Sequence, residues 1–119
     1  MTSKELFDLQ HKIFRECIDI LKKKNSDYAG LDSDALANFK RASMLNVEPP
    51  RGVLVRLSDK ISRLVSFIDK GSFKVDDEAV ADTVQDAINY LVIFNALYID
   101  HENQSKKESQ EASEEGKHR

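Results

Sequence analysis

The chain has 119 residues, of which 40% are hydrophobic, so it suits one domain with one modest core. Eighteen basic and 21 acidic residues give a formal net charge of -3, which argues against the broad basic surface of a duplex DNA-binding protein. We therefore expect no direct binding to duplex DNA. The one cysteine, Cys17, stands among apolar neighbours, which predicts a small buried side chain and excludes a disulfide framework.

The start of the chain, MTSKELFDLQHK, is rich in charge and lacks the apolar run of a secretory signal. Nowhere do about 18 apolar residues follow one another, so no membrane contact is expected. These observations lead us to expect a cytoplasmic protein.

Residues 4–23 show the first helical pattern, with an apolar stripe opposite a charged one. Turn-forming residues then predict a loop of about ten residues, followed by a short helix over 35–45. Asp32 or Ser33 is expected to cap this second helix, and the side chains of Leu36, Phe39 and Met44 are expected to point inward.

A third helix should start at Pro49 and Pro50, which suit a first helical turn, and end at Gly71. Its expected inward stripe contains Leu54, Leu57, Ile61, Leu64, Val65 and Ile68. The fourth helix should open at the acidic residues 76–78 and continue into INYLVIFNALYI, which is apolar on nearly all sides. Such a helix is surrounded by the other helices of its bundle or held by a second subunit, and we expect a homo-oligomer formed through this last helix.

Residues 101–119 contain almost no hydrophobic side chains, which predicts a disordered polar tail. The sequence therefore predicts an all-α helical bundle of about four helices over residues 1–100, with the tail over 101–119.

Two charged stripes single out the third and fourth helices. Glu78, Asp82 and Asp86 rise along one face of the fourth helix, where like charges at steps of four disfavour an isolated helix. The third helix carries basic residues and one further acid at helical spacing: Arg56, Asp59, Lys60 and Arg63.

Two interpretations of the stripes stay open at this point. The acids pair with the bases as an ordinary ion-pair network between helices. Alternatively, Asp82 and Asp86, with Glu16 as a third carboxylate, bind Mg²⁺, while Arg56, Lys60 and Arg63 bind phosphate. In the second case Asp59 orients Lys60 or joins the metal ligands.

Further candidate ligand-binding residues lie outside the stripes. Asn38 and Asn89 are amides suited to a base or sugar. The segment KKKNSDYAG combines a cation, an acid and an aromatic ring in Lys24, Asp27 and Tyr28. Asp27 is also an ordinary turn former, and Tyr28 either stacks on a nucleobase or fixes the loop to the core.

An ordered set of short motifs resembles the nucleotide modification associated domain, type one, a helical family of bacteria and their phages. The matching segments are K-x-x-DY-x-G from Lys24 to Gly30, the pair Asn38 and Phe39, RLSDKISRL around Lys60, and DEAVADTVQDAINY. Together they span about residues 16 to 91. That family is similar in architecture to the MazG-like all-α nucleoside triphosphate pyrophosphohydrolases.

The resemblance implies a magnesium-dependent protein that cleaves a nucleoside triphosphate to its monophosphate and pyrophosphate. It also implies a location in a bacterium or in a phage-infected host cell. In this interpretation Asp59 and Lys60 are the catalytic candidates. The chain lacks the EExxE and ExxD pair of those enzymes and offers Glu16 with Asp19, and Asp82 with Asp86, in their place. The alternatives are a non-catalytic protein that binds or sequesters a nucleotide, such as a phage accessory protein, and a structural helical interaction module.

Overall fold

The computed structural model describes residues 1–28, 34–71 and 76–117, and the side chains of 1–25, 34–71 and 76–114. The described residues form helices and no strand, which confirms the all-α fold class. In chain order the elements are α1 (Ser3–Tyr28), α2 (Ala37–Lys40), the 3₁₀ helix η1 (Arg41–Leu45), α3 (Pro49–Lys70) and α4 (Asp77–Lys117). No helix in these ranges has a stretch both apolar enough and long enough to span a lipid bilayer.

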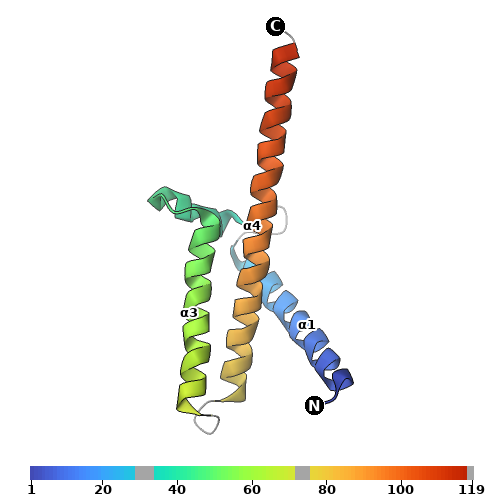
Figure 1. Ribbon diagram of the computed structural model, residues 1–119, viewed down its shortest axis with the longest axis vertical. Helices are drawn as coiled ribbons and strands as arrows, with labels where there is room; N and C mark the ends of the chain where they lie inside the picture. Colours follow the sequence, from blue (N-terminus) through green and yellow to red (C-terminus); the bar gives the residue numbers. More distant parts are fainter. Residues whose placement is uncertain (29–33, 72–75, 118–119) are drawn as a thin grey trace.

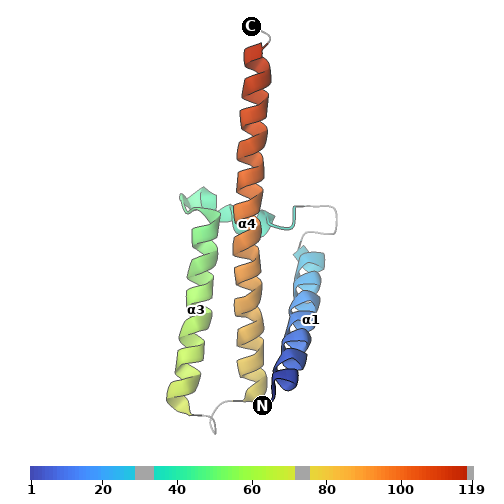
Figure 2. The same ribbon diagram turned by 45° about the vertical axis from the view of Figure 1, so that its right-hand side comes forward.

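The fourth helix is the centre of the molecule. Both α3 and α1 pack on α4, one on each side of it, while α2 and η1 cross between the top of α3 and the end of α1 (Figures 1 and 2). The C-terminal part of α4 extends beyond all other helices, so the molecule measures 71 × 34 × 28 Å. The bundle is therefore an open array of helices.

Helix α1 starts with a reciprocal cap and ends later than expected. The Glu5 N–H donates to Thr2 Oγ1, and the Thr2 N–H donates to Glu5 Oε2, both at 3.1 Å, which satisfies two end groups of the helix. The pattern predicted an end at Lys23, but α1 continues to Tyr28. Extending a formed helix fixes one residue for each new hydrogen bond, so turn-forming residues at its end did not stop it.

The segment after α1 differs in part from the single helix expected over 35–45. One α-helical turn, α2, passes directly into η1, which ends at Asn46 in the left-handed conformation (φ 59°). Asp34 Oδ1 accepts from the Leu36 N–H at 2.9 Å, whereas the expected caps Asp32 and Ser33 lie outside the described residues. Leu36 packs against the core, as does Phe39. The prediction that Met44 points inward is wrong, because 82% of this residue is exposed.

Helix α3 has the predicted bounds but not the predicted inward face. Pro49 and Pro50 open it, and Gly71 follows its last residue with φ 79°, a left-handed conformation that favours glycine. Val53 is the residue that α3 buries completely, at 1% exposure. Four residues of the expected inward stripe are instead 43–79% exposed: Leu54, Ile61, Val65 and Ile68. The face of α3 that contacts α4 is rotated around the helix axis from the expected face by about one residue, or roughly 100°.

The apolar core forms where α3 and α4 meet under α2. Val53, Ile93 and Leu97 are its buried members. Partly buried hydrophobic residues from α1, α4 and the start of α2 pack against them: Leu21, Leu36, Phe39, Tyr90 and Phe94. Cys17 is buried separately, between α1 and α4, at 3% exposure, as the sequence predicted.

Residues 101–117 continue α4 as a helix, where composition led us to expect disorder. The described side chains from 101 to 114 are all exposed, so this part adds nothing to the core. A helix that is already anchored by packing propagates without a new nucleation step, and Glu, Lys, Gln and Ala are good helix formers.

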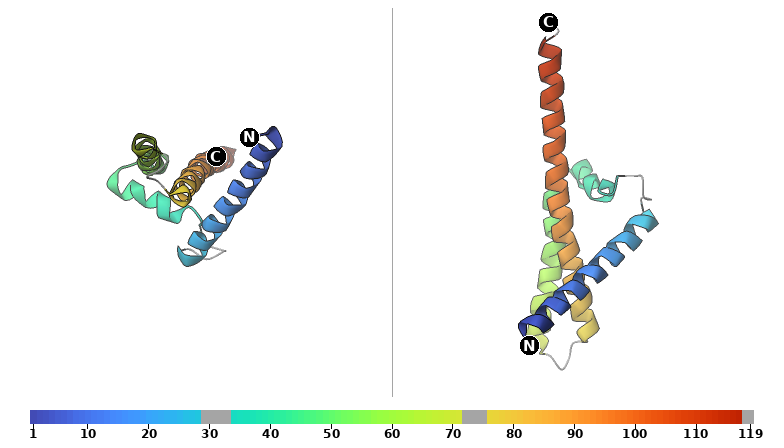
Figure 3. Two further views of the ribbon diagram at one scale, coloured as in Figure 1. Left: turned by 90° about the horizontal axis from the view of Figure 1, so that it is seen from below. Right: turned by 90° about the vertical axis from the view of Figure 1, so that its right-hand side faces the viewer.

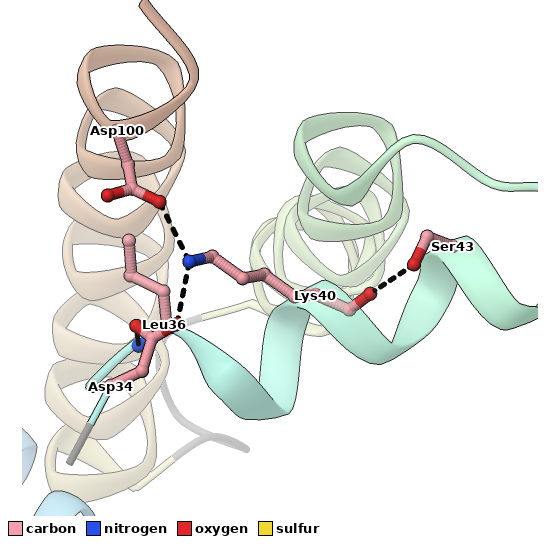
Figure 4. Close-up of polar contacts among 5 residues, drawn as sticks. All are labelled: Asp34, Leu36, Lys40, Ser43 and Asp100. Carbon is pink, nitrogen blue, oxygen red and sulfur yellow. Dashed lines mark hydrogen bonds and ion pairs between the residues drawn. The ribbon is translucent and has the colours of Figure 1, made fainter. Parts of the chain in front are cut away.

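A three-residue ion-pair cluster holds α2 against α4 (Figure 4). Lys40 Nζ lies 2.6 Å from Asp34 Oδ2 and 2.7 Å from Asp100 Oδ2. Hydrogen bonds to Asp100 and Asp34 raise the pKa of Lys40. The hydrogen bond from Lys40, followed by that from the Leu36 N–H, lowers the pKa of Asp34. The cluster therefore favours the charged form of both groups in the folded state.

The cluster predicts a defined pH dependence of stability. The lowered pKa of Asp34 stabilises the fold above its ordinary value of 3.8, and this contribution is lost as the pH falls through the folded pKa. The raised pKa of Lys40 stabilises the fold below its ordinary value of 10.5 and is lost as the pH rises through the folded pKa. Lys40→Met should therefore lower the melting temperature most at pH values between 3.8 and 10.5.

We expect Lys40→Met to lower the free energy of unfolding by about 1 kcal/mol, because partly exposed ion pairs each contribute about 0.2–1 kcal/mol. Thermal denaturation followed by circular dichroism across the pH range measures it. Lys22→Met is the control, since Lys22 is exposed and has no ion pair among the described residues. A difference between Lys40→Met and the natural protein that stayed constant from acid to alkali would contradict the prediction.

Candidate functional site

A cavity of about 310 Å³ lies where the end of α1, α2, α3 and α4 converge. This volume is at the lower end of the range of small-molecule sites. We call it the α2 pocket. Its lining residues are Leu21, Lys24, Asn25, Asp34, Ala35, Ala37, Asn38, Phe39, Arg41, Arg56, Asp86, Asn89, Tyr90 and Ile93.

The floor of the α2 pocket belongs to α4, and hydrogen bonds hold that helix against α1. Asn89 is 8% exposed, and its Nδ2 donates to the Cys17 carbonyl oxygen at 3.1 Å. One turn away, Gln85 Nε2 donates to Glu16 Oε2, and the Cys17 thiol donates to the Gln85 carbonyl oxygen at 3.8 Å. These bonds fix the distance between the two helices that form one wall and the floor.

The Cys17 thiol beneath the pocket is not a reactive group. Burial, together with the negative charges of Glu16 and Asp86, raises its pKa. Since the thiolate is the nucleophile and metal ligand, a raised pKa keeps the residue in its inert form at neutral pH. Cys17 therefore has a packing role.

The side chains around the pocket leave a surplus of positive charge facing it. Lys24, Arg41 and Arg56 are the cationic lining residues, and Asp34 and Asp86 are the acidic ones. Both acids have lysine partners outside the pocket lining, and Asp86 also lies 3.7 Å from Nζ of the lining residue Lys24. Asp34 contacts Lys40, and Asp86 Oδ2 lies 3.0 Å from the nitrogen of a lysine on α3, Lys60, whose side chain is only 14% exposed.

Aromatic and amide groups complete the lining. The Arg56 guanidinium lies 5.1 Å from the centre of the Phe39 ring, in a cation–π contact that joins α2 to α3. Tyr90 and Ile93 add apolar surface next to the amide of Asn89, and Asn38 adds an exposed amide at the rim. The pocket thus combines cations for phosphate, flat apolar surface for a ring and amides for polar ring edges.

The structure brings together five of the residues that the sequence predicted for ligand or metal binding. They come from four different helices and all line the α2 pocket: Lys24, Asn38, Arg56, Asp86 and Asn89. Lys60 joins them indirectly through Asp86, which also lies 3.7 Å from Lys24 Nζ. The contact between Lys60 and Asp86 is a member of the ion-pair network that was one of the two predicted interpretations.

Other predicted residues lie away from this pocket. Asp59 and Arg63 have exposed side chains and pair with each other at 3.6 Å on α3. Asp82 is exposed on α4 and does not line the pocket. Glu16 accepts a hydrogen bond from Gln85 and lies below the floor. The side chains of Asp27 and Tyr28 lie outside the described residues.

Comparison of the chain with protein-family models, with curated proteins and with solved structures finds no match.

The described carboxylates do not form a donor set for a metal held by protein alone. No group of three His, Cys, Asp or Glu residues in the described part of the chain is arranged to hold a metal ion. Asp86 is the acid of the predicted metal set that faces the pocket, and two lysines contact it. Because Mg²⁺ is commonly bound by one or two carboxylates together with substrate phosphates, a cation here would arrive on a phosphorylated ligand.

Sequence reasoning missed several lining residues that helical spacing could have found. Arg41 follows Asn38 by three residues, so both lie on one side of a helical turn. Tyr90 follows Asp86 by four residues on α4 for the same reason. Asp34 carries no comparable signal, because it precedes α2 and is positioned by its bonds to Lys40 and Leu36.

Proposed function

We propose that this chain binds a nucleotide in the α2 pocket, as a complex with Mg²⁺. The observation that carries the proposal is the lining itself, in which Lys24, Arg41 and Arg56 surround an apolar and aromatic floor. A phosphate chain pairs with Arg41 and Arg56, which have no acidic partner among the described residues, and with Lys24, whose contact with Asp86 is the longer of the two lysine contacts of that acid. The base lies against Tyr90 and Phe39, with Asn38 and Asn89 within reach of its polar edge.

The second candidate function is cleavage of the bound nucleoside triphosphate to its monophosphate and pyrophosphate. It rests on the motif resemblance and on the position of Lys60 and Asp86 next to the pocket. In this function Lys24 and Arg56 would neutralise charge that develops on the phosphates, and Asp86 would be the pocket acid nearest to a phosphate-bound cation. With either function we propose a cytoplasmic location, because nucleoside triphosphates are abundant there.

A panel of nucleosides and of nucleoside mono- and triphosphates, each with Mg²⁺ and with EDTA, tests binding by thermal shift. Triphosphates should raise the melting temperature most, since a ligand at 100 times its Kd adds about 2.7 kcal/mol to the free energy of unfolding. Nucleosides should have little effect, because they lack the group that the cations recognise. If no phosphorylated ligand raised the melting temperature, a structural helical module would be the better description.

Product analysis by anion-exchange chromatography distinguishes the two functions. Release of pyrophosphate from a triphosphate that binds would show the hydrolase. Recovery of the intact triphosphate after long incubation with Mg²⁺ would show a binding protein. Asp86→Asn serves both assays, because it removes the carboxylate next to the phosphates while keeping its size.

A homo-oligomer formed through α4 is a further part of the proposal. Leu91, Val92, Tyr98 and Ile99 of α4 are each 50–55% exposed in the single chain. Large apolar side chains gathered on one helix face usually mark an interaction surface.

A further inference from the structure

Helices α3 and α4 leave one apolar side of their pair uncovered. On α3, Leu54, Ile61, Val65 and Ile68 are 43–79% exposed and, with Ser58 between them, follow one another at alternating steps of four and three. This is the spacing of a helix seam that packs against another helix. On α4, Leu91 and Tyr98 are seven residues apart on the exposed side and are both more than half exposed.

The two seams lie on the same side of the helix pair. On each helix the seam lies roughly 100° further around the axis than the residues that face the other helix. Because α3 and α4 run in opposite directions, this rotation is clockwise on one helix and anticlockwise on the other when both are viewed from the same end. Both seams therefore face the same side of the helix pair. Viewed along the helices, α2 and η1 lie on the other side of the pair and α1 lies beside α4 (Figure 3, left). We call the open side the α3–α4 face.

The surface area of the chain shows how much remains to be covered. The accessible surface is 9623 Å². The scaling relation for compact monomers gives only about 6500 Å² for 13.5 kDa. The extended end of α4 and the exposed apolar side chains of α1, α3 and α4 all contribute to the excess. A stable interface buries about 800 Å² on each partner, so the excess is large enough for one.

We infer that a second copy of this chain covers the α3–α4 face, with the two α3 helices antiparallel and crossing near Ile61. The charges on α3 favour this occupant. Arg51 lies ten residues before Ile61 and Asp69 eight residues after it, on the same flank of the seam. A two-fold axis at Ile61 brings Arg51 of one copy next to Asp69 of the other. Their heights along the helix axis then differ by only about 3 Å.

Arg51 and Asp69 are free for this pairing. Both are exposed, and neither has an ion-pair partner in the described part of the chain. The symmetric dimer contains the pair twice, once on each side of the axis. A seam with a cation at one end and an anion at the other matches a second copy of itself only when the two helices are antiparallel. These charges therefore favour both a second copy as the partner and an antiparallel orientation.

This inference gives the proposed homo-oligomer a contact surface that includes α3 as well as α4, and it is independent of nucleotide binding. The α2 pocket lies on the side of α2, away from the α3–α4 face, so dimer formation leaves the pocket accessible. A protein that dimerises but binds no nucleotide would support the inference and oppose the proposed function. A protein that binds a nucleotide but stays monomeric would support the proposed function and oppose this inference.

Sedimentation velocity over a range of protein concentrations tests the interface. The natural chain should sediment as a dimer, and Ile61→Glu should raise the dissociation constant at least about 100-fold, because two like charges would meet at a desolvated axis. Met44→Glu is the matched control, since Met44 is also apolar, 82% exposed and not part of the seam, and it should leave the dimer intact. A natural chain that stays monomeric at the highest concentration reached would overturn the inference.

A charge exchange tests the orientation without altering the apolar seam. Arg51→Glu and Asp69→Arg should each raise the dissociation constant about tenfold by placing like charges opposite each other. The double variant should return it to the natural value. Because both side chains are exposed, circular dichroism should show all three variants folded. A double variant no tighter than either single one would overturn the antiparallel arrangement.

Discussion

Replacing Arg56 with alanine should weaken nucleotide binding by about 10- to 100-fold. Arg56 lines the α2 pocket and is positioned over the Phe39 ring, so its guanidinium is directed before a ligand arrives. A hydrogen bond to a charged group contributes about 1.5–3 kcal/mol, and 1.4 kcal/mol corresponds to a factor of ten in Kd. Isothermal titration calorimetry with the triphosphate that gives the largest thermal shift measures the change. Arg56→Lys should fall between, because lysine keeps the charge and loses the planar fork.

Arg63→Ala is the informative comparison for Arg56→Ala. Both arginines belong to the basic stripe of α3, seven residues apart, but Arg63 pairs with Asp59 on the exposed side of that helix. The structure therefore predicts little change in Kd for Arg63→Ala. If the two variants lost affinity equally, the stripe as a whole would form the phosphate site and the α2 pocket would not. Arg15→Ala, on the exposed side of α1, controls for the loss of one positive charge.

Leu97→Ala should destabilise the fold by about 2–5 kcal/mol, the range for removing a buried leucine side chain. Leu97 is 4% exposed and shares the core with Val53 and Ile93, so its truncation leaves a cavity between α3 and α4. For a domain of this size each kcal/mol lowers Tm by about 4–8 °C, so we expect a drop of at least 8 °C. Thermal and urea denaturation measure it.

Leu45→Ala is the control for the core substitution. It removes the same atoms from a residue of η1 that is 80% exposed, so the free energy of unfolding should change by less than about 0.5 kcal/mol. Equal losses in the two variants would mean that the apolar core is not centred between α3 and α4.

The bounds of α3 could be predicted from sequence, whereas its orientation could not. Pro49 and Gly71 act through local backbone geometry, which the sequence contains in full. Helix α3 has two apolar stripes, and its inward face is the one that the neighbouring helix covers. The stripe with Leu54, Ile61 and Val65 looks the more hydrophobic, yet α4 packs on the face of Val53, which also carries Lys60.

For the candidate site, helical spacing predicted residues within one helix better than contacts between helices. Asp86 and Asn89 share a face of α4 and both reach the α2 pocket. The separation of Asp82 from Asp86 was not predictable, because the tilt of α1 and α3 against α4 decides where the pocket ends. Nor does any pattern indicate that Lys40 joins residues 34 and 100, which are distant in sequence and meet only through the packing of α2 on α4.

The C-terminal part of α4 has a practical consequence. Residues 101–117 would hold an attached label or surface roughly 25 Å from the packed helices, by the rise of an α-helix. A fluorophore or a biosensor chip coupled there would stay clear of the α2 pocket, whose lining residues all precede Asp100. The natural chain therefore supplies its own spacer for single-molecule and immobilised measurements.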